Sequence, residues 1–369
     1  MILGLASGII VFILGITGAL YAFKTEIESL SQKYKKVGIE NRDVIPPSVA
    51  LKIAEESNPD IHVHGVIYRE PCDAVEVIYY QPDPLYYGAA YLNPYSGEVI
   101  KIVNFVHTFF GFVYHGHIAL WLPLKIGMPI IAVAALVFLV MLITGLILWW
   151  PRKNSSSRNF SFTKGVPSSI KRLEQHKVVG FYVIWLGLLL VLTGMTFVFR
   201  GFDKVVYKAM GGKKDATFSM PPSDTTNAHS VTFTGEPIDM LFERIKAQNP
   251  EIHFIEIHAV EDSVSPFLVE LNRDPSTYWK MDYLFFDQYT LEPIRPEHVY
   301  GSFDDADTPD KIKRMYYDIH TGSILGFPGK LLAFLASLFC ASLPVTGFVM
   351  WRNRRKEKKA FLRNMNQIR

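Results

Sequence analysis

Four stretches of the chain contain no charged residue and no histidine, and each is long enough to cross a lipid bilayer. They cover residues 1–23, 128–150, 178–199 and 331–351. A helix needs about 20 apolar residues to span the hydrocarbon core. A helix on the surface of a soluble domain would show a polar stripe, which these stretches lack. The pattern predicts four transmembrane helices, and we interpret the first as an anchor because it lacks a basic leader and a small-residue cleavage site.

The segments between these helices differ in charge. The short segment 151–177 carries seven Lys/Arg and one Glu, and the tail 352–369 carries eight Lys/Arg and one Glu. The long segments 24–127 and 200–330 are acidic on balance. Short basic segments stay in the cytoplasm. We therefore expect both termini and the loop 151–177 to be cytoplasmic, and the two long segments to face outward.

The two long segments resemble each other, so the chain is predicted to be an internal tandem repeat. Asn58-Pro59-Asp60-Ile61-His62 recurs as Asn249-Pro250-Glu251-Ile252-His253. Each copy follows an amphipathic helical stretch, over 47–57 and 237–248, and precedes strand-like runs over 63–80 and 254–271. Turn-forming sequences over 93–98 and 287–292 also correspond. The predicted fold is a membrane α-helical bundle with two outer α+β domains, over 24–103 and 200–315, each followed by an interfacial segment, over 104–127 and 316–330.

The apolar stretches repeat as well, because each carries Thr-Gly near its C-terminal end. The pairs are Thr17-Gly18, Thr144-Gly145, Thr193-Gly194 and Thr346-Gly347. His117 and His320 lie in matched outer segments that end at a proline and lead into a span, and we expect a short interfacial helix there. His176 stands at the inner mouth of the third span. By the spacing of the repeat, the partner of His176 would fall one residue upstream of Met1.

Paired neutral imidazoles in a helical bundle are a typical way to ligate the iron of haem b. Glycines allow the ring to approach the backbone. By depth, Gly18 and Gly194 should lie level with His117 and His320, and Gly145 and Gly347 level with His176. This predicts two haems, one in each leaflet. For the second ligand of the inner haem, either the start at Met1 is truncated or this copy has lost the histidine. The alternatives are that the histidines cap helices or sit at the headgroups, and that the small-residue pairs serve helix packing only.

Other histidines are weaker candidates. His107 and His115 lie near His117 but have no counterpart in the second half, so they are second choices, as propionate contacts or proton donors. His62 and His64 point to one face of a strand and could bind a metal. Because the second copy has His253 and His258 at a different spacing, we favour a solvated strand face over a metal site at His62 and His64. Two cysteines exclude a disulfide framework, and a net charge of +3 gives no argument for nucleic acid.

Several residues together resemble the PepSY-associated transmembrane family, the iron-regulated inner-membrane proteins that include siderophore reductases. The motifs are Gly4-Leu-Ala-Ser-Gly8 with Thr17-Gly18, Asn93-Pro-Tyr-Ser-Gly-Glu98, His117 through Gly145 to Pro151, His176-Lys-Val-Val-Gly180, and Tyr317-Asp-Ile-His-Thr-Gly322 through Thr346-Gly347. The resemblance covers nearly the whole chain. It implies PepSY-type periplasmic domains, a haem-bearing four-helix core and a bacterial inner-membrane location.

The function implied by this resemblance is reduction of a ferric chelate on the periplasmic side. Nucleotide and flavin motifs are absent from the sequence, so a separate donor on the cytoplasmic side would supply electrons. The expected partners are the lipid bilayer, a ferric siderophore and that donor.

One alternative is a non-enzymatic, membrane-anchored PepSY module that binds an envelope partner or a peptidase. A second is a haem or metal permease, although the spans carry no Asp, Glu, Lys or Arg.

Overall fold

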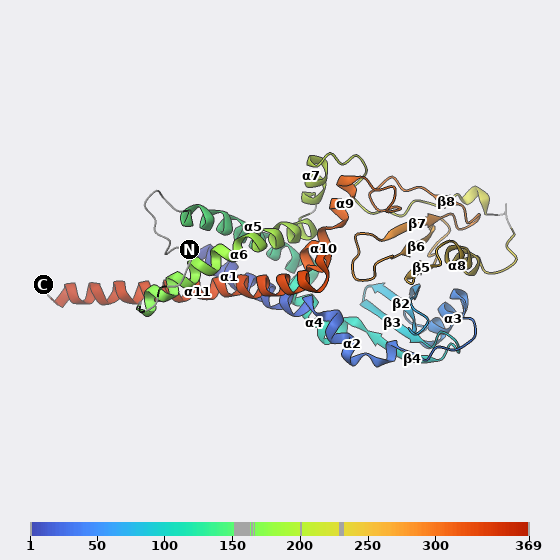
Figure 1. Ribbon diagram of the computed structural model, residues 1–369, viewed down its shortest axis with the longest axis horizontal. Helices are drawn as coiled ribbons and strands as arrows, with labels where there is room; N and C mark the ends of the chain where they lie inside the picture. Colours follow the sequence, from blue (N-terminus) through green and yellow to red (C-terminus); the bar gives the residue numbers. More distant parts are fainter. Residues whose placement is uncertain are drawn as a thin grey trace. The chain divides into compact units, whose positions relative to one another are not determined.

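The computed structural model describes residues 2–150, 163, 165, 167–199, 201–228 and 232–367. Most of the basic loop 151–177 lies outside the described residues, as do His229 and the last two residues of the tail. The chain divides into two compact units. We call residues 1–24, 112–202 and 319–369 the helical unit, and residues 25–111 and 203–318 the sheet unit. Figure 1 labels their elements.

Long apolar helices build the helical unit: α1 Ile2–Ala22, α5 Leu124–Trp149, α6 Ser168–Val198 and α11 Gly326–Gln367. Three described helices, which include most of α5, α6 and α11, are long and apolar enough to cross a membrane. A fourth candidate is α1 together with α2 (Lys24–Ser31), which follows it at a bend of 50°. The count of three, or four with the bent pair, agrees with a multi-pass membrane protein.

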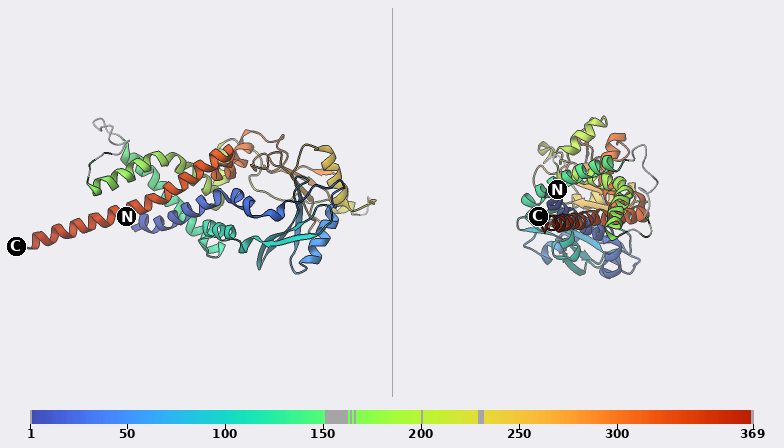
Figure 2. Two further views of the ribbon diagram at one scale, coloured as in Figure 1. Left: turned by 60° about the horizontal axis from the view of Figure 1, so that its bottom comes forward. Right: turned by 90° about the vertical axis from the view of Figure 1, so that its left-hand side faces the viewer.

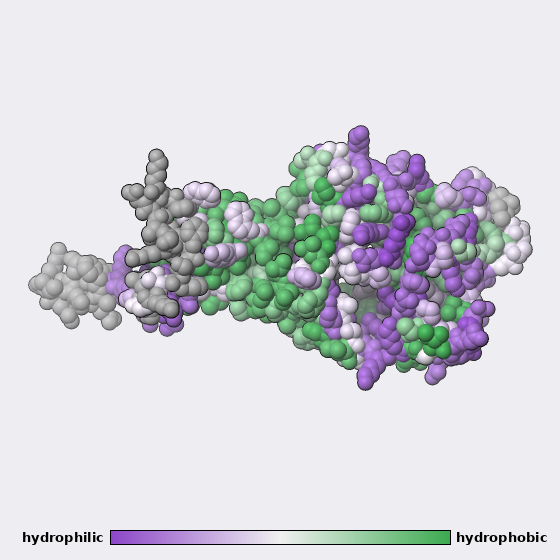
Figure 3. All heavy atoms as spheres, viewed as in Figure 1, coloured by the Kyte–Doolittle hydropathy of each residue, from purple (hydrophilic) through white to green (hydrophobic). Residues whose placement is uncertain are grey.

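The face of the helical unit that Figure 3 shows is largely hydrophobic, as a lipid-facing surface requires. Val133, Ile147 and Leu148 are among its exposed side chains. In a soluble protein, apolar patches of this extent are rare. Inside the unit, α1 lies against α11 at small residues (Figure 2): a Cβ on Gly15 would stand 2.7 Å from the Ser337 carbonyl oxygen. Close backbone approach through small residues is the usual packing of membrane helices.

One eight-stranded antiparallel sheet forms the sheet unit, in the order β4-β3-β2-β1-β5-β6-β7-β8. The first repeat contributes β1 Val63–Tyr68, β2 Val75–Pro82, β3 Leu85–Leu92 and β4 Val99–Asn104. The second contributes β5 Ile255–His258, β6 Phe267–Leu271, β7 Asp282–Phe286 and β8 Pro293–Ile294. The repeats join where β1 pairs with β5, Val66 opposite Ile257. The sequence predicted two outer domains, and the structure joins their strands in one continuous sheet.

The helices α3 (Pro47–Ser57) and α8 (Pro237–Gln248) begin and end where the amphipathic pattern predicted. Their apolar sides pack on the core of the sheet, around Val66, Tyr79 and Ile257. The two helices are linked, because Ser48 donates from its backbone N–H at 2.8 Å and from its hydroxyl at 2.6 Å to the carboxylate of Asp239. The opposite face of the sheet has a smaller apolar cluster and several charged side chains.

Both predicted turns are confirmed. Asn93 closes the β3–β4 hairpin with a backbone bond to Glu98 at 2.8 Å, and Asp287 closes the β7–β8 hairpin with a bond to Glu292 at 2.9 Å. In each turn the side chain of the first residue accepts the N–H groups two and three residues later. This is the local bonding that favours Asn and Asp in turns.

Short helices complete the chain. They are α4 Phe109–Ala119, α7 Phe202–Ala209, α9 Thr308–Arg314 and α10 Tyr316–Thr321, with single 3₁₀ turns at Lys33–Lys35, Phe105–His107, Thr225–Asn227 and Ser323–Leu325. The interfacial segments were predicted over 104–127 and 316–330, and α4 and α10 lie inside these ranges. Both helices end shortly after His117 and His320, before the prolines that close the segments. The side chain of Thr108 accepts the N–H of Gly111 at 3.0 Å and so caps the start of α4.

Candidate functional site

Two histidines from different repeats meet inside the helical unit. His117 lies near the end of α4, and His320 lies near the end of α10. Their ring centres are 6.2 Å apart, with an angle of 58° between the ring planes. The two imidazoles therefore form a tilted ring pair, with one ring supplied by each repeat.

Threonine hydroxyls hold both rings at Nδ1. Thr17 Oγ1 lies 3.1 Å from Nδ1 of His117, and Thr193 Oγ1 lies 3.0 Å from Nδ1 of His320. Each hydroxyl lies 2.7 Å from the carbonyl oxygen four residues earlier in its own helix, to which it donates its proton. Because that proton is used, the hydroxyl oxygen must accept a hydrogen bond from Nδ1–H. The resulting tautomer leaves the lone pair on Nε2, the atom available to a metal.

A carbonyl contact supports the same tautomer for His320. The carbonyl oxygen of Leu190 lies 3.1 Å from Nδ1 of His320, and a carbonyl oxygen can only accept. Within the described parts of the chain, no hydrogen bond involves Nε2 of His117 or His320. Both rings are therefore oriented by bonds on one nitrogen, an arrangement typical of histidines whose other nitrogen ligates a metal.

The glycines of the Thr-Gly pairs make room for these rings. A Cβ on Gly18 would stand 3.0 Å from Cε1 of His117, and a Cβ on Gly194 would stand 3.1 Å from Cε1 of His320. Such distances are closer than ordinary carbon–carbon contacts of about 3.5–4.0 Å. The Thr-Gly pair thus acts as a unit, in which threonine binds the imidazole and glycine lets it approach the helix.

His176 is held in the same way, by the Thr-Gly pair of α11. Its Nδ1 lies 2.7 Å from the Thr346 hydroxyl, which in turn lies 3.0 Å from the carbonyl oxygen of Leu343. A Cβ on Gly347 would stand 3.8 Å from Cε1 of His176, an ordinary contact. The structure therefore places three of the four Thr-Gly pairs against a histidine.

The fourth pair has no histidine against it in the described residues. Thr144 Oγ1 donates at 2.8 Å to its own helix, at the carbonyl of Val140. No described heavy atom outside its helix lies within 4 Å of a Cβ placed on Gly145. Gly145 was predicted to lie level with His176, and the structure brings no imidazole to it.

The second-choice histidines, His107 and His115, have other surroundings. Nε2 of His115 lies 3.0 Å from the carbonyl oxygen of Leu122, so it must carry the proton that it donates. That bond leaves Nε2 of His115 unavailable as a ligand. His107 is exposed in the 3₁₀ turn that precedes α4.

The residues around His117 and His320 fit a haem held by two axial imidazoles. A metal bonded to both Nε2 atoms at about 2 Å on each side would separate the ring centres by about 6 Å. The observed separation of 6.2 Å agrees with this value. Glycines beside both rings and hydrogen bonds at both Nδ1 atoms are further features that such a site needs.

A second group of polar residues lies in the sheet unit, on the charged face of the sheet. Glu256, His258 and Glu270 place one ligand atom each within 4.8 Å of one another. Burial, followed by the charge of Glu270, raises the pKa of Glu256 to about 7. Burial alone would lower the pKa of His258, but its contacts with Glu270 and Glu256 outweigh that effect and raise it. Glu256 and His258 therefore hold their protons more tightly than the isolated side chains would.

His62, directly before β1, and His64, within β1, gain a partner that the sequence did not indicate. Glu261, in the loop after β5, lies within reach of both rings. Burial, followed by the nearby His258, lowers the pKa of His64. Glu261 belongs to the other repeat and lies almost two hundred residues after His64 in the chain, so no local spacing could have identified it.

The threonines of the Thr-Gly pairs were visible as a repeated motif, but their bonds to Nδ1 of the histidines were not predicted.

The apolar helices and the hydrophobic surface of the helical unit define a multi-pass membrane protein. A family model described as "PepSY-associated TM region" matches residues 1–354. The chain therefore belongs to the PepSY-associated transmembrane family. No curated protein matches it.

Proposed function

We propose that this protein is a haem-containing reductase of the bacterial inner membrane. It passes electrons from a cytoplasmic donor to a ferric chelate, such as a siderophore, on the periplasmic side. The observation that carries the proposal is the pair His117 and His320, with ring centres 6.2 Å apart and each Nδ1 bound to a threonine. Haem b would supply reversible one-electron chemistry between these imidazoles.

The chain's own residues would hold, orient and insulate the site. Thr17 and Thr193 keep Nε2 of each histidine deprotonated, and Gly18 and Gly194 keep the space beside the rings open. Aromatic packing adds an apolar wall, because the ring of Phe197 lies 5.8 Å from the ring of His320. His176 lies near the start of α6, at the opposite end of this helix from Thr193, and is held there by Thr346 of α11. It is the candidate ligand of an inner haem.

Reduction would release iron because the lower charge of ferrous iron weakens its bonds to hard oxygen ligands. Its bonds to soft and nitrogen ligands weaken less. The direction follows from charge: the basic segments 151–177 and 352–369 favour the cytoplasm, and the acidic segments favour the periplasm. A donor on the basic side would therefore reduce a chelate on the acidic side.

The visible spectrum of the purified full-length protein, before and after dithionite, tests the proposal. We expect a bis-imidazole haem b spectrum that His117→Ala and His320→Ala each remove or convert to a different ligation. His115→Ala is the matched control, since His115 lies on the same helix and should leave the spectrum unchanged. A colourless protein after expression with ample haem would overturn the proposal and favour an anchored PepSY module.

The reaction itself is tested in sealed vesicles with an electron donor inside and a ferric hydroxamate outside. Ferrous iron should appear outside with the wild-type chain and not with His117→Ala or His320→Ala. A haem-loaded protein that leaves the external chelate oxidised would contradict the reductase assignment. Uptake of the chelate without a donor would instead identify a permease.

A further inference from the structure

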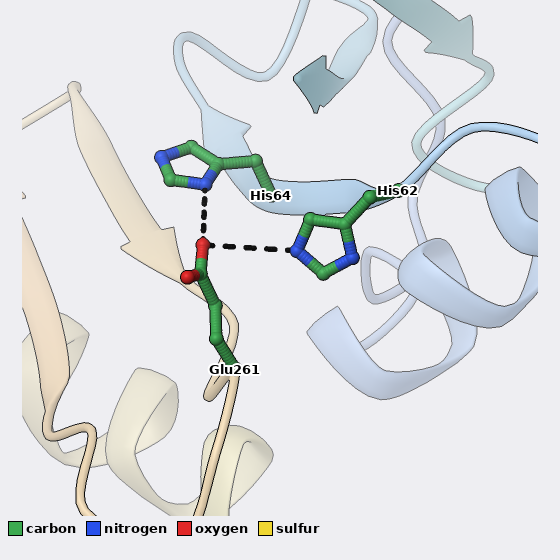
Figure 4. Close-up of side chains that lie close together, drawn as sticks. All are labelled: His62, His64 and Glu261. Atoms are coloured by element: carbon green, nitrogen blue, oxygen red, sulfur yellow. Dashed lines mark hydrogen bonds and ion pairs between the residues drawn. The ribbon is translucent and has the colours of Figure 1, made fainter. Parts of the chain in front are cut away.

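The seam between the two repeats brings together three metal-ligating side chains. His62 directly precedes β1, His64 is the second residue of β1, and Glu261 comes from the loop after β5 (Figure 4). Oε1 of Glu261 lies 3.2 Å from Nδ1 of His64 and 3.7 Å from Nε2 of His62. Each of the three residues offers one ligand atom, and these atoms all lie within 4.8 Å of one another.

These distances suit a small transition-metal ion. Ligands bonded to zinc at about 2.0–2.1 Å in a tetrahedron lie about 3.4 Å from one another. The two observed separations lie on either side of that value. In Figure 4 both imidazoles turn toward the same carboxylate oxygen, so a cation could bind among the three atoms with small side-chain movements.

The strand is irregular at this place, which explains how two nearby histidines reach one carboxylate. The register of β1 against β2 shifts between Val63 and Gly65, so His64 is the extra residue of a β-bulge. Bulges redirect side chains and often lie next to functional sites. The ring of His64 is also supported from the side, with its centre 4.7 Å from that of His258 and 5.9 Å from that of Tyr80.

The geometry points to a binding site for a divalent transition-metal ion at His62, His64 and Glu261. Two imidazoles and one carboxylate suit zinc or ferrous iron and leave at least one coordination position open. Calcium and magnesium, which prefer oxygen ligands, should not compete. The side chains of His62 and Glu261 are 51% and 53% exposed, so the ion would exchange with solvent. This site goes beyond the proposed reductase function and does not depend on haem.

The second repeat offers a matched control. His253 corresponds to His62, and its Nδ1 lies 3.6 Å from a carboxylate oxygen of Glu70. The residue that corresponds to His64 is Ile255, which is buried in the sheet. His253 and Glu70 thus form the pair that corresponds to His62 and Glu261, but without a second imidazole. This pair should not hold the ion.

Calorimetric titration of the tag-free full-length protein with Zn²⁺, and anaerobically with Fe²⁺, tests the site. We expect the wild type and His253→Ala to bind an ion at this site with equal affinity. We expect binding at least about 100-fold weaker in His62→Ala, His64→Ala and Glu261→Gln, because even the loss of an outer-shell partner costs about 10–100-fold. Addition of Mg²⁺ should not reduce Zn²⁺ binding.

The controls separate this site from the haem site. Zn²⁺ binding should persist in His117→Ala, whereas the haem spectrum should persist in His62→Ala and Glu261→Gln. Thermal unfolding shows whether each variant is folded, and Glu261→Gln is the mildest of the three because the residue is exposed. Equal Zn²⁺ affinity in the wild type and Glu261→Gln would overturn the proposal, as would an equal loss in His253→Ala. Either result would leave simple histidine–glutamate hydrogen bonds at the seam.

Discussion

At the scale of single residues, the space beside Gly18 and Gly194 is the feature most sensitive to change. A Cβ at either position would stand 3.0–3.1 Å from an imidazole carbon, and valine would add two further carbons. Overpacking of this kind costs about 1–3 kcal/mol. We expect Gly18→Val and Gly194→Val to weaken haem binding roughly tenfold or more, measured as the haem-to-protein ratio during a haem titration.

Gly145→Val is the control for this prediction. No described atom outside its helix lies within 4 Å of a Cβ at Gly145, so valine there should leave haem binding unchanged. If all three variants lost haem equally, the loss would reflect general damage to the membrane helices rather than displacement of the histidines.

A second prediction concerns the protonation of Glu256. The groups that face it are Glu270 on β6, His258 on its own strand, Glu76 on β2 and Arg69 after β1. Its pKa is raised to about 7 from an ordinary 4.5, mainly by burial. The folded chain therefore keeps a proton that the unfolded chain releases. The resulting stabilisation is complete below pH 4.5 and is lost as the pH rises to about 7.

Thermal unfolding between pH 5 and 8 tests this prediction, with EDTA present to exclude metal ions. The contribution is of the order of 3 kcal/mol at most. Across that range, the melting temperature of the wild type should fall more steeply with pH than that of Glu256→Gln, which carries no titrating proton. Parallel pH profiles for the two proteins would mean that Glu256 ionises at its ordinary pKa.

At the scale of elements, the Thr-Gly pair is a repeated device for holding a histidine against a neighbouring helix. Thr17→Val and Thr193→Val keep the size of the side chain and remove the acceptor of Nδ1–H. Loss of such an outer-shell partner costs about 10–100-fold in metal affinity. We expect weaker haem binding and a changed midpoint potential in both variants, measured by redox titration. Thr144→Val, whose hydroxyl bonds only its own helix among the described residues, should leave both values unchanged.

The elements show where sequence patterns are reliable and where they are not. The bounds of α3 and α8 were predicted correctly because an amphipathic pattern, proline at the start and asparagine at the end all agree. The predicted interfacial ranges 104–127 and 316–330 contain α4 and α10, but the pattern did not show where these helices end. The backbone at Leu120 and Trp121 has positive φ, and Gly127 must pass the carbonyl of Ala119, so the chain turns sharply after His117. Such a turn depends on tertiary packing, which a hydrophobic pattern does not report.

At the scale of the whole molecule, the duplication was visible in sequence but its consequence was not. Each repeat has the strands of one half-sheet, and β1 and β5 would each be an unpaired edge if the repeats stood alone. Unpaired edges invite pairing with another strand, and here each edge pairs with the other. His62, His64 and Glu261 come together only through this pairing, because the loop that carries Glu261 follows β5. Neither repeat by itself contains the three ligands.

The sidedness of the chain can be tested with its own cysteines. Cys72 is half-buried in the sheet unit, and Cys340 is buried in α11. The charge distribution predicts that a membrane-impermeant maleimide labels Cys72 in intact spheroplasts and that Cys72→Ser abolishes the signal, since Cys340 is inaccessible. In the Cys72→Ser background, Lys358→Cys places a new thiol on the exposed basic tail. This thiol should react only after the membrane is permeabilised. Labelling of Lys358→Cys in intact spheroplasts would contradict the predicted orientation. The proposed electron transfer would then run toward the cytoplasm, away from any extracellular chelate.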